Sequence, residues 1–207
     1  MPARGFMGKL SRWFSGPSDT YFFGIQIAIK CFGEDTLRAQ FARVLQESRL
    51  ADENAQEKRR FIKRFVALLE ESELFWTYGF WEYNDNQKEA PEEFRTWVDE
   101  IESCLATEEE ELDEEIDEIR RTSNRKDFVV ASLLFLLDEP YEPAELIANE
   151  DNAYLKETFV SLVQGLTRID PLLIQADGAY VVPGNEEDGL SEDDLYDPGW
   201  SYLRMLL

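Results

Sequence analysis

The sequence predicts an α+β (or α/β) domain in which several helices, one of them long and acidic, cover a small three- to four-stranded sheet. Three observations predict this class. Three extended segments alternate with helical ones, the apolar period switches between two and about 3.6 residues, and 43% of the 207 residues are hydrophobic. That content suffices for one core, so we expect a single domain over residues 20–207, preceded by a separate segment at residues 1–16.

Residues 1–16 have the pattern of a short basic amphipathic helix that ends at Gly16-Pro17. Its apolar residues recur at helical spacing, with basic residues between them: Phe6, Leu10, Trp13 and Phe14, and Arg4, Lys9 and Arg12. We expect this segment to dock on its own acidic domain, because terminal amphipathic helices usually pack in this way. Attachment to a membrane surface or to a partner is the less favoured alternative.

The first strand and the two helices after it are predicted by apolar spacing. Apolar residues alternate strictly from Phe23 to Cys31, which predicts a strand at about residues 22–31. Helical spacing follows at residues 37–48 and again at residues 58–69. The second helix carries a basic cluster on its outer side: Lys58, Arg59, Arg60, Lys63 and Arg64. We expect this cluster to pair with the glutamate-rich helix described below, and binding of an acidic partner or phosphate is the alternative.

Residues 75–83 contain six aromatic residues in nine positions and are expected to form an extended segment or a packed loop. Such density usually marks a hydrophobic core. The alternatives are that the rings stack on a planar ligand or anchor a protein interface. For the interface, we predict Trp76, Tyr78 and Trp81 as partner-binding residues.

A long helix is predicted from Pro91, which is well placed in a first turn. Residues 108–118 within it hold nine carboxylates in eleven positions. Calcium loops need a glycine turn and a wrapped geometry that a straight helix lacks, so a solvated face that binds a basic partner is favoured over a metal site. The predicted partner-binding residues are Glu110, Asp113, Glu114 and Asp117.

The second half of the chain predicts two further strands and two helices. The continuous apolar run at residues 127–137 is typical of a central strand that is covered on both faces. A helix is expected from Asn152 until Asp170-Pro171, and an extended segment follows at residues 172–182. Ser191 and Asp194 have the spacing of a capping box that begins a short last helix.

Composition excludes several functional classes. The chain has no histidine, and its two cysteines are far apart, so we expect no zinc site, no disulfide framework and no cofactor. A formal charge of −23 opposes direct contact with nucleic acid. The apolar runs reach only about half the roughly 20 residues that a transmembrane helix needs. We therefore expect a cytoplasmic protein, with peripheral membrane contact as the alternative.

Several segments, taken in order, resemble the family called domain of unknown function 1517, which is found in cyanobacteria, plastids and other bacteria. The similar segments are residues 25–28 (IQIA), 75–79 (FWTYG), 128–134 (FVVASLL), 180–183 (YVVP), 187–188 (ED) and 190–195 (LSEDDL). The resemblance spans about residues 20–206. For many relatives it implies membrane proximity, but it supplies no reaction, ligand or catalytic residue for this chain.

These observations favour a non-catalytic interaction or regulatory module that presents an acidic helix and an aromatic patch to a protein partner with a basic surface. One alternative is an enzyme that works with Asp and Glu, assisted by a divalent metal ion, for which a buried carboxylate pair in a pocket would be diagnostic. A second alternative is an acidic mimic of nucleic acid that blocks a DNA-binding protein. Sequence patterns leave the partner and the oligomeric state open.

Overall fold

The computed structural model describes residues 19–31, 36–51, 54–113, 127–147, 152–183, 190–197 and 199–207, and for residues 36, 47–51 and 106–113 the course of the helix alone. The predicted segment at residues 1–16 lies outside this description. The strands are β1 (Tyr21–Lys30), β2 (Trp76–Asn84), β3 (Phe128–Leu137), β4 (Ile174–Val182) and β5 (Arg204–Met205). The α-helices are α1 (Thr36–Ala51), α2 (Ala55–Glu71), α3 (Ala90–Asp113), α5 (Glu142–Glu145) and α6 (Lys156–Leu166), and the 3-10 turns are η1 (Glu73–Phe75), η3 (Pro171–Leu173) and η4 (Asp194–Tyr196).

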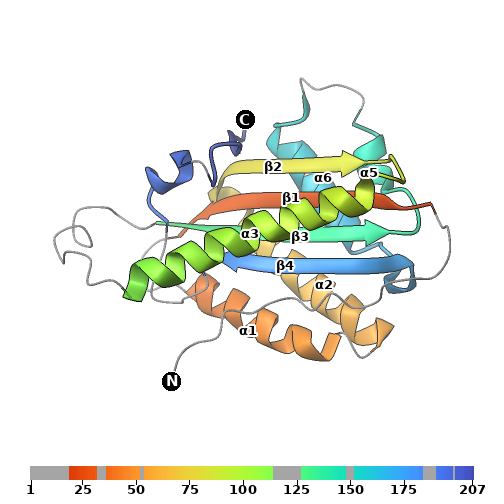
Figure 1. Ribbon diagram of the computed structural model, residues 1–207, viewed down its shortest axis with the longest axis horizontal. Coiled ribbons are helices and arrows are strands. Elements are labelled where there is room, and N and C mark those ends of the chain that lie inside the picture. Colours follow the sequence, from red (N-terminus) through yellow and green to blue (C-terminus); the bar gives the residue numbers. More distant parts are fainter. Residues whose placement is uncertain are drawn as a thin grey trace.

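The strands of the described chain form one five-stranded sheet in the order β4-β3-β1-β2-β5 (Figure 1). Each strand pair is antiparallel, so the fold is α+β. The expectation of three to four strands is too low, because the aromatic sequence of β2 fits a strand or a loop and β5 is only two residues long. The interior position predicted for residues 127–137 is confirmed, since β3 lies between β4 and β1 and all its residues are buried.

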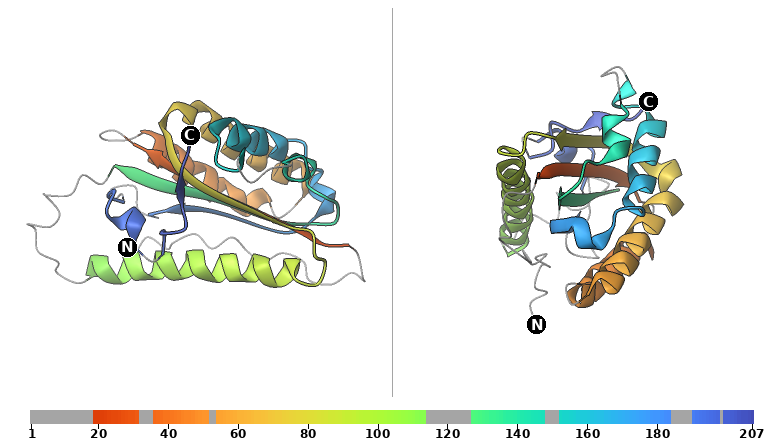
Figure 2. Two further views of the ribbon diagram at one scale, coloured as in Figure 1. Left: turned by 90° about the horizontal axis from the view of Figure 1, so that it is seen from above. Right: turned by 90° about the vertical axis from the view of Figure 1, so that its right-hand side faces the viewer.

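Helices cover both faces of the sheet (Figure 2). Alternation along β1 sends Phe23, Ile25 and Ile27 into a core shared with α1, α2 and α6. Its intervening side chains, Phe22 and Ala28 among them, face a second core beneath α3 and the C-terminal residues. The sheet therefore separates the α1, α2 and α6 layer from α3, which crosses the opposite face diagonally (Figure 1).

A bulge explains why β2 was hard to predict. The register with β1 shifts between Ala28 and Ile29, so that Ala28 pairs with Tyr78 and Ile29 with Trp76. Two residues that strict alternation would place on one face consequently lie on opposite faces. Trp76 belongs to the core beside α2, whereas Tyr78 belongs to the core beneath α3.

The remaining predicted elements are present, with small shifts at their ends. The helix expected from Asn152 is α6, and the strand expected from residue 172 begins at Ile174, after the short turn η3. The capping box is also present. The Ser191 amide donates to Asp194 Oδ2 at 2.6 Å, and the Asp194 amide donates to Ser191 Oγ at 3.2 Å. The turn that follows, η4, is a 3-10 turn of three residues.

Candidate interaction surfaces

The three aromatic residues predicted to bind a partner do not come together on the surface. Trp76 and Tyr78 are 5% and 7% exposed and lie on opposite faces of the sheet. Trp81 is half-buried and packs against the same core as Trp76. An aromatic patch made of these three rings is therefore not formed, because the bulge and the covering helices place two of them inside.

Each ring is held by a polar contact that suits a structural role. The indole nitrogen of Trp76 donates to the Leu69 carbonyl at 3.1 Å, and that of Trp81 donates to the Ala153 carbonyl at 2.8 Å. The Tyr78 hydroxyl donates to Glu192 Oε1 at 3.1 Å and lies 3.4 Å from the Tyr196 hydroxyl. The contact with Tyr196, followed by burial and by Glu192, raises the pKa of Tyr78. The phenol therefore stays protonated as a hydrogen-bond donor.

The predicted acidic residues divide between described and undescribed parts of the chain. Glu110 and Asp113 lie on α3, of which the last turns are described only as backbone. Glu114 and Asp117 lie outside the described residues. As far as the sequence of α3 shows, this helix carries ten Asp or Glu against one Arg, a net charge of −9.

The described part of α3 has one packed side and one exposed side. Its packed side fills the second core with Phe94, Trp97, Val98 and Ile101. Its exposed carboxylates are those of Glu92, Asp99 and Glu100. These three carboxylates face solvent together with Arg95, which lies one turn from both Glu92 and Asp99, as expected for the solvated side of an amphipathic helix.

Two carboxyl groups at the margin of α3 have raised pKa values. Burial raises the pKa of Glu93, and the nearby carboxylate of Glu82 raises it further. Burial, followed by the charge of Asp99, also raises the pKa of Glu102. Burial is the larger cause of both shifts, and the neighbouring carboxylates add to it because like charges disfavour ionisation.

An enzyme that works with Asp and Glu would need a buried carboxylate pair in a pocket, and this face holds a pair of neighbouring carboxyl groups. Glu82 and Glu93 are close, and Glu82 Oε2 accepts a hydrogen bond of 2.9 Å from the Trp97 indole. Both lie beside α3, on the opposite side of the sheet from the groove described below. Among the residues that the structure describes, no group of three or more His, Cys, Asp or Glu is arranged to hold a metal ion.

The basic cluster on α2 makes ion pairs on its own side of the sheet. Lys58 pairs with Asp177 of β4, and Arg59 Nη2 lies 3.7 Å from Asp170 Oδ1. Arg60 donates to Glu57 Oε2 at 3.0 Å. For these three residues the predicted pairing with the glutamate-rich helix is wrong, because the described length of α3 lies across the sheet from α2.

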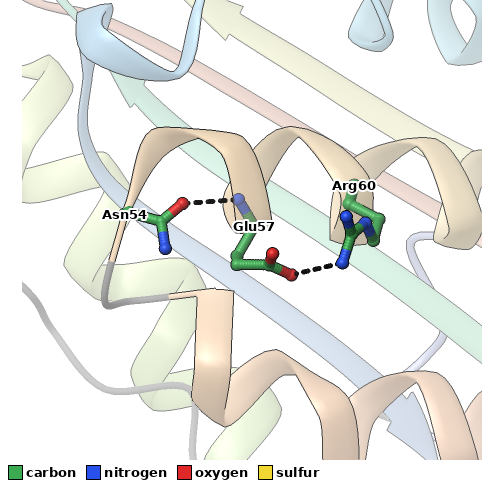
Figure 3. Close-up of polar contacts among 3 residues, drawn as sticks. All are labelled: Asn54, Glu57 and Arg60. Carbon is green, nitrogen blue, oxygen red and sulfur yellow. Dashed lines mark hydrogen bonds and ion pairs between the residues drawn. The ribbon is translucent and has the colours of Figure 1, made fainter.

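The start of α2 shows how the sequence fixes this layer locally. The Asn54 side chain caps the helix by accepting from the Glu57 amide at 2.9 Å, while the Glu57 carboxylate reaches Arg60 one turn later (Figure 3). The backbone amide and the side-chain carboxylate of Glu57 therefore both form hydrogen bonds at the start of α2. These local bonds hold the beginning of the basic helix without any contribution from α3.

Sequence reasoning missed a groove between α1 and α2. Its volume is about 530 Å³, and it is lined by Ala39, Gln40, Arg43, Val44, Arg64, Ala67, Leu68 and Glu71. The lining positions recur every three or four residues on each helix, which is the spacing of one helix face. That spacing is visible in the sequence, but the pairing of the two faces requires knowing that α1 and α2 lie side by side.

The structure also reveals a separation of charge that the total of −23 conceals. The helices α1 and α2 together carry eight Lys or Arg against four Asp or Glu, a net charge of +4. The net charge of −9 on α3 lies on the other side of the sheet. The helices α1 and α2, with their positive net charge, and the acidic α3 therefore lie on opposite sides of the sheet (Figure 2).

Comparison of the chain with models of protein families, with curated proteins and with solved structures gave no match. The resemblance to the domain of unknown function 1517 stays a prediction that depends on the short segments named above. Within the described residues, every helix is too short or too polar to pass through a bilayer.

Proposed function

We propose that this protein is a non-catalytic interaction module whose acidic α3 surface binds a protein partner with a basic surface. We define the acidic α3 surface by Glu92, Asp99 and Glu100, continued along the helix by Glu110 and Asp113. We also propose that the chain belongs to the domain of unknown function 1517 family, on the segments that resemble it.

The observation that carries this proposal is the charge separation across the sheet. Carboxylates concentrated on one helix create a local negative potential that steers a basic partner and orients it. The charge of Glu82 is the part of the raised pKa of Glu93 that supports this potential, and it adds to the larger effect of burial. A basic partner would relieve part of this repulsion on binding.

The position of the carboxylate pair favours binding over catalysis. Glu82 interacts with Glu93 and accepts the hydrogen bond that the single indole N–H of Trp97 donates. An acid–base mechanism needs such a pair beside a substrate-sized hollow. The groove that the structure describes is lined by residues of α1 and α2 instead.

The proposal is tested by capturing partners from the native host with the full chain and identifying each contact by cross-linking. The test variant neutralises three exposed carboxylates of α3: Glu92→Gln, Asp99→Asn and Glu100→Gln. The matched control removes the same charge from exposed residues elsewhere: Glu139→Gln, Glu142→Gln and Glu157→Gln. We expect a partner whose cross-links fall on a basic patch and on α3, and which the test variant loses while the control retains it.

Salt provides a second readout of the same contact. The partner should be bound at 0.1 M salt and released near 1 M, because the Debye length falls from about 10 Å to about 3 Å. Retention of the partner by the α3 variant would contradict the proposal, as would a neutral partner surface. Displacement of the partner by duplex DNA would favour the nucleic-acid mimic.

A further inference from the structure

The groove between α1 and α2 combines an apolar floor with a charged rim. Val44 and Leu68 are buried beneath it, and the small side chains of Ala39 and Ala67 leave the hollow unfilled. Arg43 and Arg64 are exposed and line it from opposite helices. Its volume of about 530 Å³ is within the range of natural ligand sites, roughly 300–1,000 Å³.

The charged residues that line the groove are two Arg and one Glu, a net charge of +1, although the chain as a whole carries −23. The α1 and α2 layer carries a net charge of +4, and the acidic α3 lies beyond the sheet. Each helix layer is about 10–12 Å thick. The two outer surfaces are therefore separated by more than two Debye lengths, since one Debye length is about 8 Å at physiological ionic strength.

We propose that this groove binds an acidic peptide segment of a second protein. An apolar side chain of the peptide would occupy the hollow between Ala39 and Ala67, and flanking carboxylates would pair with Arg43 and Arg64. This combination of apolar anchor and charged flank is the usual mode of helix-in-groove recognition. The inference does not depend on the acidic α3 surface.

Charge and shape favour a peptide over other occupants. A second copy of the chain carries a net charge of −23 but could present its acidic α3 to the groove, so the sedimentation measurement described below separates that occupant from a peptide. An anionic membrane surface or a polyphosphate would place negative charge evenly along the groove, including at Glu71, which lines it and is exposed. A peptide can place an uncharged residue at that position.

The test selects ligands for the full chain from a phage library of random twelve-residue peptides. The test variants are Arg43→Glu with Arg64→Glu, which reverse the rim charge, and Ala67→Trp, which fills the hollow without changing the charge. The control is Arg59→Glu with Lys63→Glu, which makes the same charge change at exposed positions of α2 that do not line the groove. Circular dichroism establishes that each variant is folded.

We expect enriched peptides with a net negative charge and at least one aliphatic or aromatic residue. The affinity of a selected peptide, measured by fluorescence anisotropy, should fall by about tenfold or more in both groove variants and by less than about threefold in the control. Because Ala67→Trp leaves the charge unchanged, its effect separates the hollow from general electrostatic attraction.

Four outcomes would overturn the proposal. These are the absence of enrichment over the rim-charge variant, enrichment of basic or uncharged peptides, equal loss of affinity in the control, and full affinity in Ala67→Trp. Binding to vesicles of phosphatidylcholine and phosphatidylserine that only the groove variants lose would assign the groove to a membrane surface. A dimer detected by sedimentation equilibrium and abolished by the groove variants would assign it to a second copy.

Discussion

Replacement of Gly24 by alanine should destabilise the domain, because α3 packs directly over this position of the central strand. A Cβ atom at Gly24 would lie 2.7 Å from Phe22 Cζ and 2.8 Å from Trp97 Cζ3. Carbon atoms in normal contact are about 3.5–4.0 Å apart. Both rings would therefore have to move by at least about 0.7 Å.

Neither ring is free to move that far. Phe22 is fully buried, and Trp97 is 6% exposed. Trp97 is held on two sides, by the hydrogen bond from its indole to Glu82 and by stacking on Phe80 at a centroid distance of 5.5 Å. Overpacking of a core typically costs about 1–3 kcal/mol. The alanine gains back about 0.4–1 kcal/mol by restricting the unfolded chain.

The expected net loss for Gly24→Ala is about 1.3 kcal/mol, which lowers Tm by about 3–5 °C in a domain of this size. Urea denaturation should show a lower midpoint with an unchanged slope. Trp97→Phe removes ring atoms from the clash, so the double variant should lose less stability than the sum of the single variants, by about 0.5–3 kcal/mol.

The matched control is Gly199→Ala. Gly199 is exposed, and a Cβ there would meet Cys104 Sγ at 3.1 Å. Its effect should stay within about 0.5 kcal/mol, as is usual for surface positions. A Gly24→Ala variant as stable as this control, or strict additivity with Trp97→Phe, would refute the close packing of α3 on β1.

Three further predictions concern buried polar and aromatic groups. The side-chain amide of the buried Gln26 donates to Ser132 Oγ at 3.2 Å, so Ser132→Ala removes its acceptor and should lower the free energy of unfolding by about 1–3 kcal/mol. Adding Gln26→Leu should recover most of this loss. Simple additivity of the two substitutions in urea denaturation would count against the hydrogen bond. Trp76→Ala should cost about 3–5 kcal/mol, since Trp76 is a core residue, and an unchanged melting temperature would contradict that role. The pKa of Glu93 is raised by burial and by Glu82. Between this raised pKa and the ordinary carboxyl pKa, the folded state therefore holds a proton that the unfolded state releases. The free energy of unfolding should rise as the pH falls from 7 through the raised pKa towards the ordinary carboxyl value. Glu93→Gln should therefore stabilise the domain at pH 7 and flatten this dependence, and an equal pH slope in both proteins would refute the assignment.

The strands differ in how far their sequences could predict them. Strands β1 and β3 have unambiguous patterns, strict alternation in one and a continuous apolar run in the other. Both are buried on both faces, but the side of β1 that faces α3 includes the small or polar residues Gly24, Gln26 and Ala28, so its sequence alternates. In β2 the bulge opposite Ala28 moves Trp76 to the other face, so no single period fits. Strand β5 has no local signal at all, since two residues become a strand only by pairing with Tyr78 and Gly79 of β2.

The sequence predicts which helices carry the charged surfaces, but not which face of the sheet each of these helices covers. The spacing of basic and acidic residues identified which helices are charged, and α2 and α3 are charged as expected. Their predicted contact required them to share a face of the sheet. Helical periodicity shows which side of a helix packs, but not which face of the sheet it covers, because that depends on strand order and on the connections between strands.

The buried sheet separates the acidic α3 surface from the groove between α1 and α2, so the two proposed binding surfaces are independent. Every residue of β3 is buried, and both of its faces are covered by packed side chains. Charges on the outer sides of the two helix layers therefore interact mainly through solvent, where screening limits their reach to about 8 Å. Neutralising Asp99 on α3 should leave the affinity of an acidic peptide for the α1 and α2 groove nearly unchanged, and reversing Arg43 should leave capture of a basic partner nearly unchanged. Loss of both ligands in either variant would instead indicate that the two binding activities share one surface.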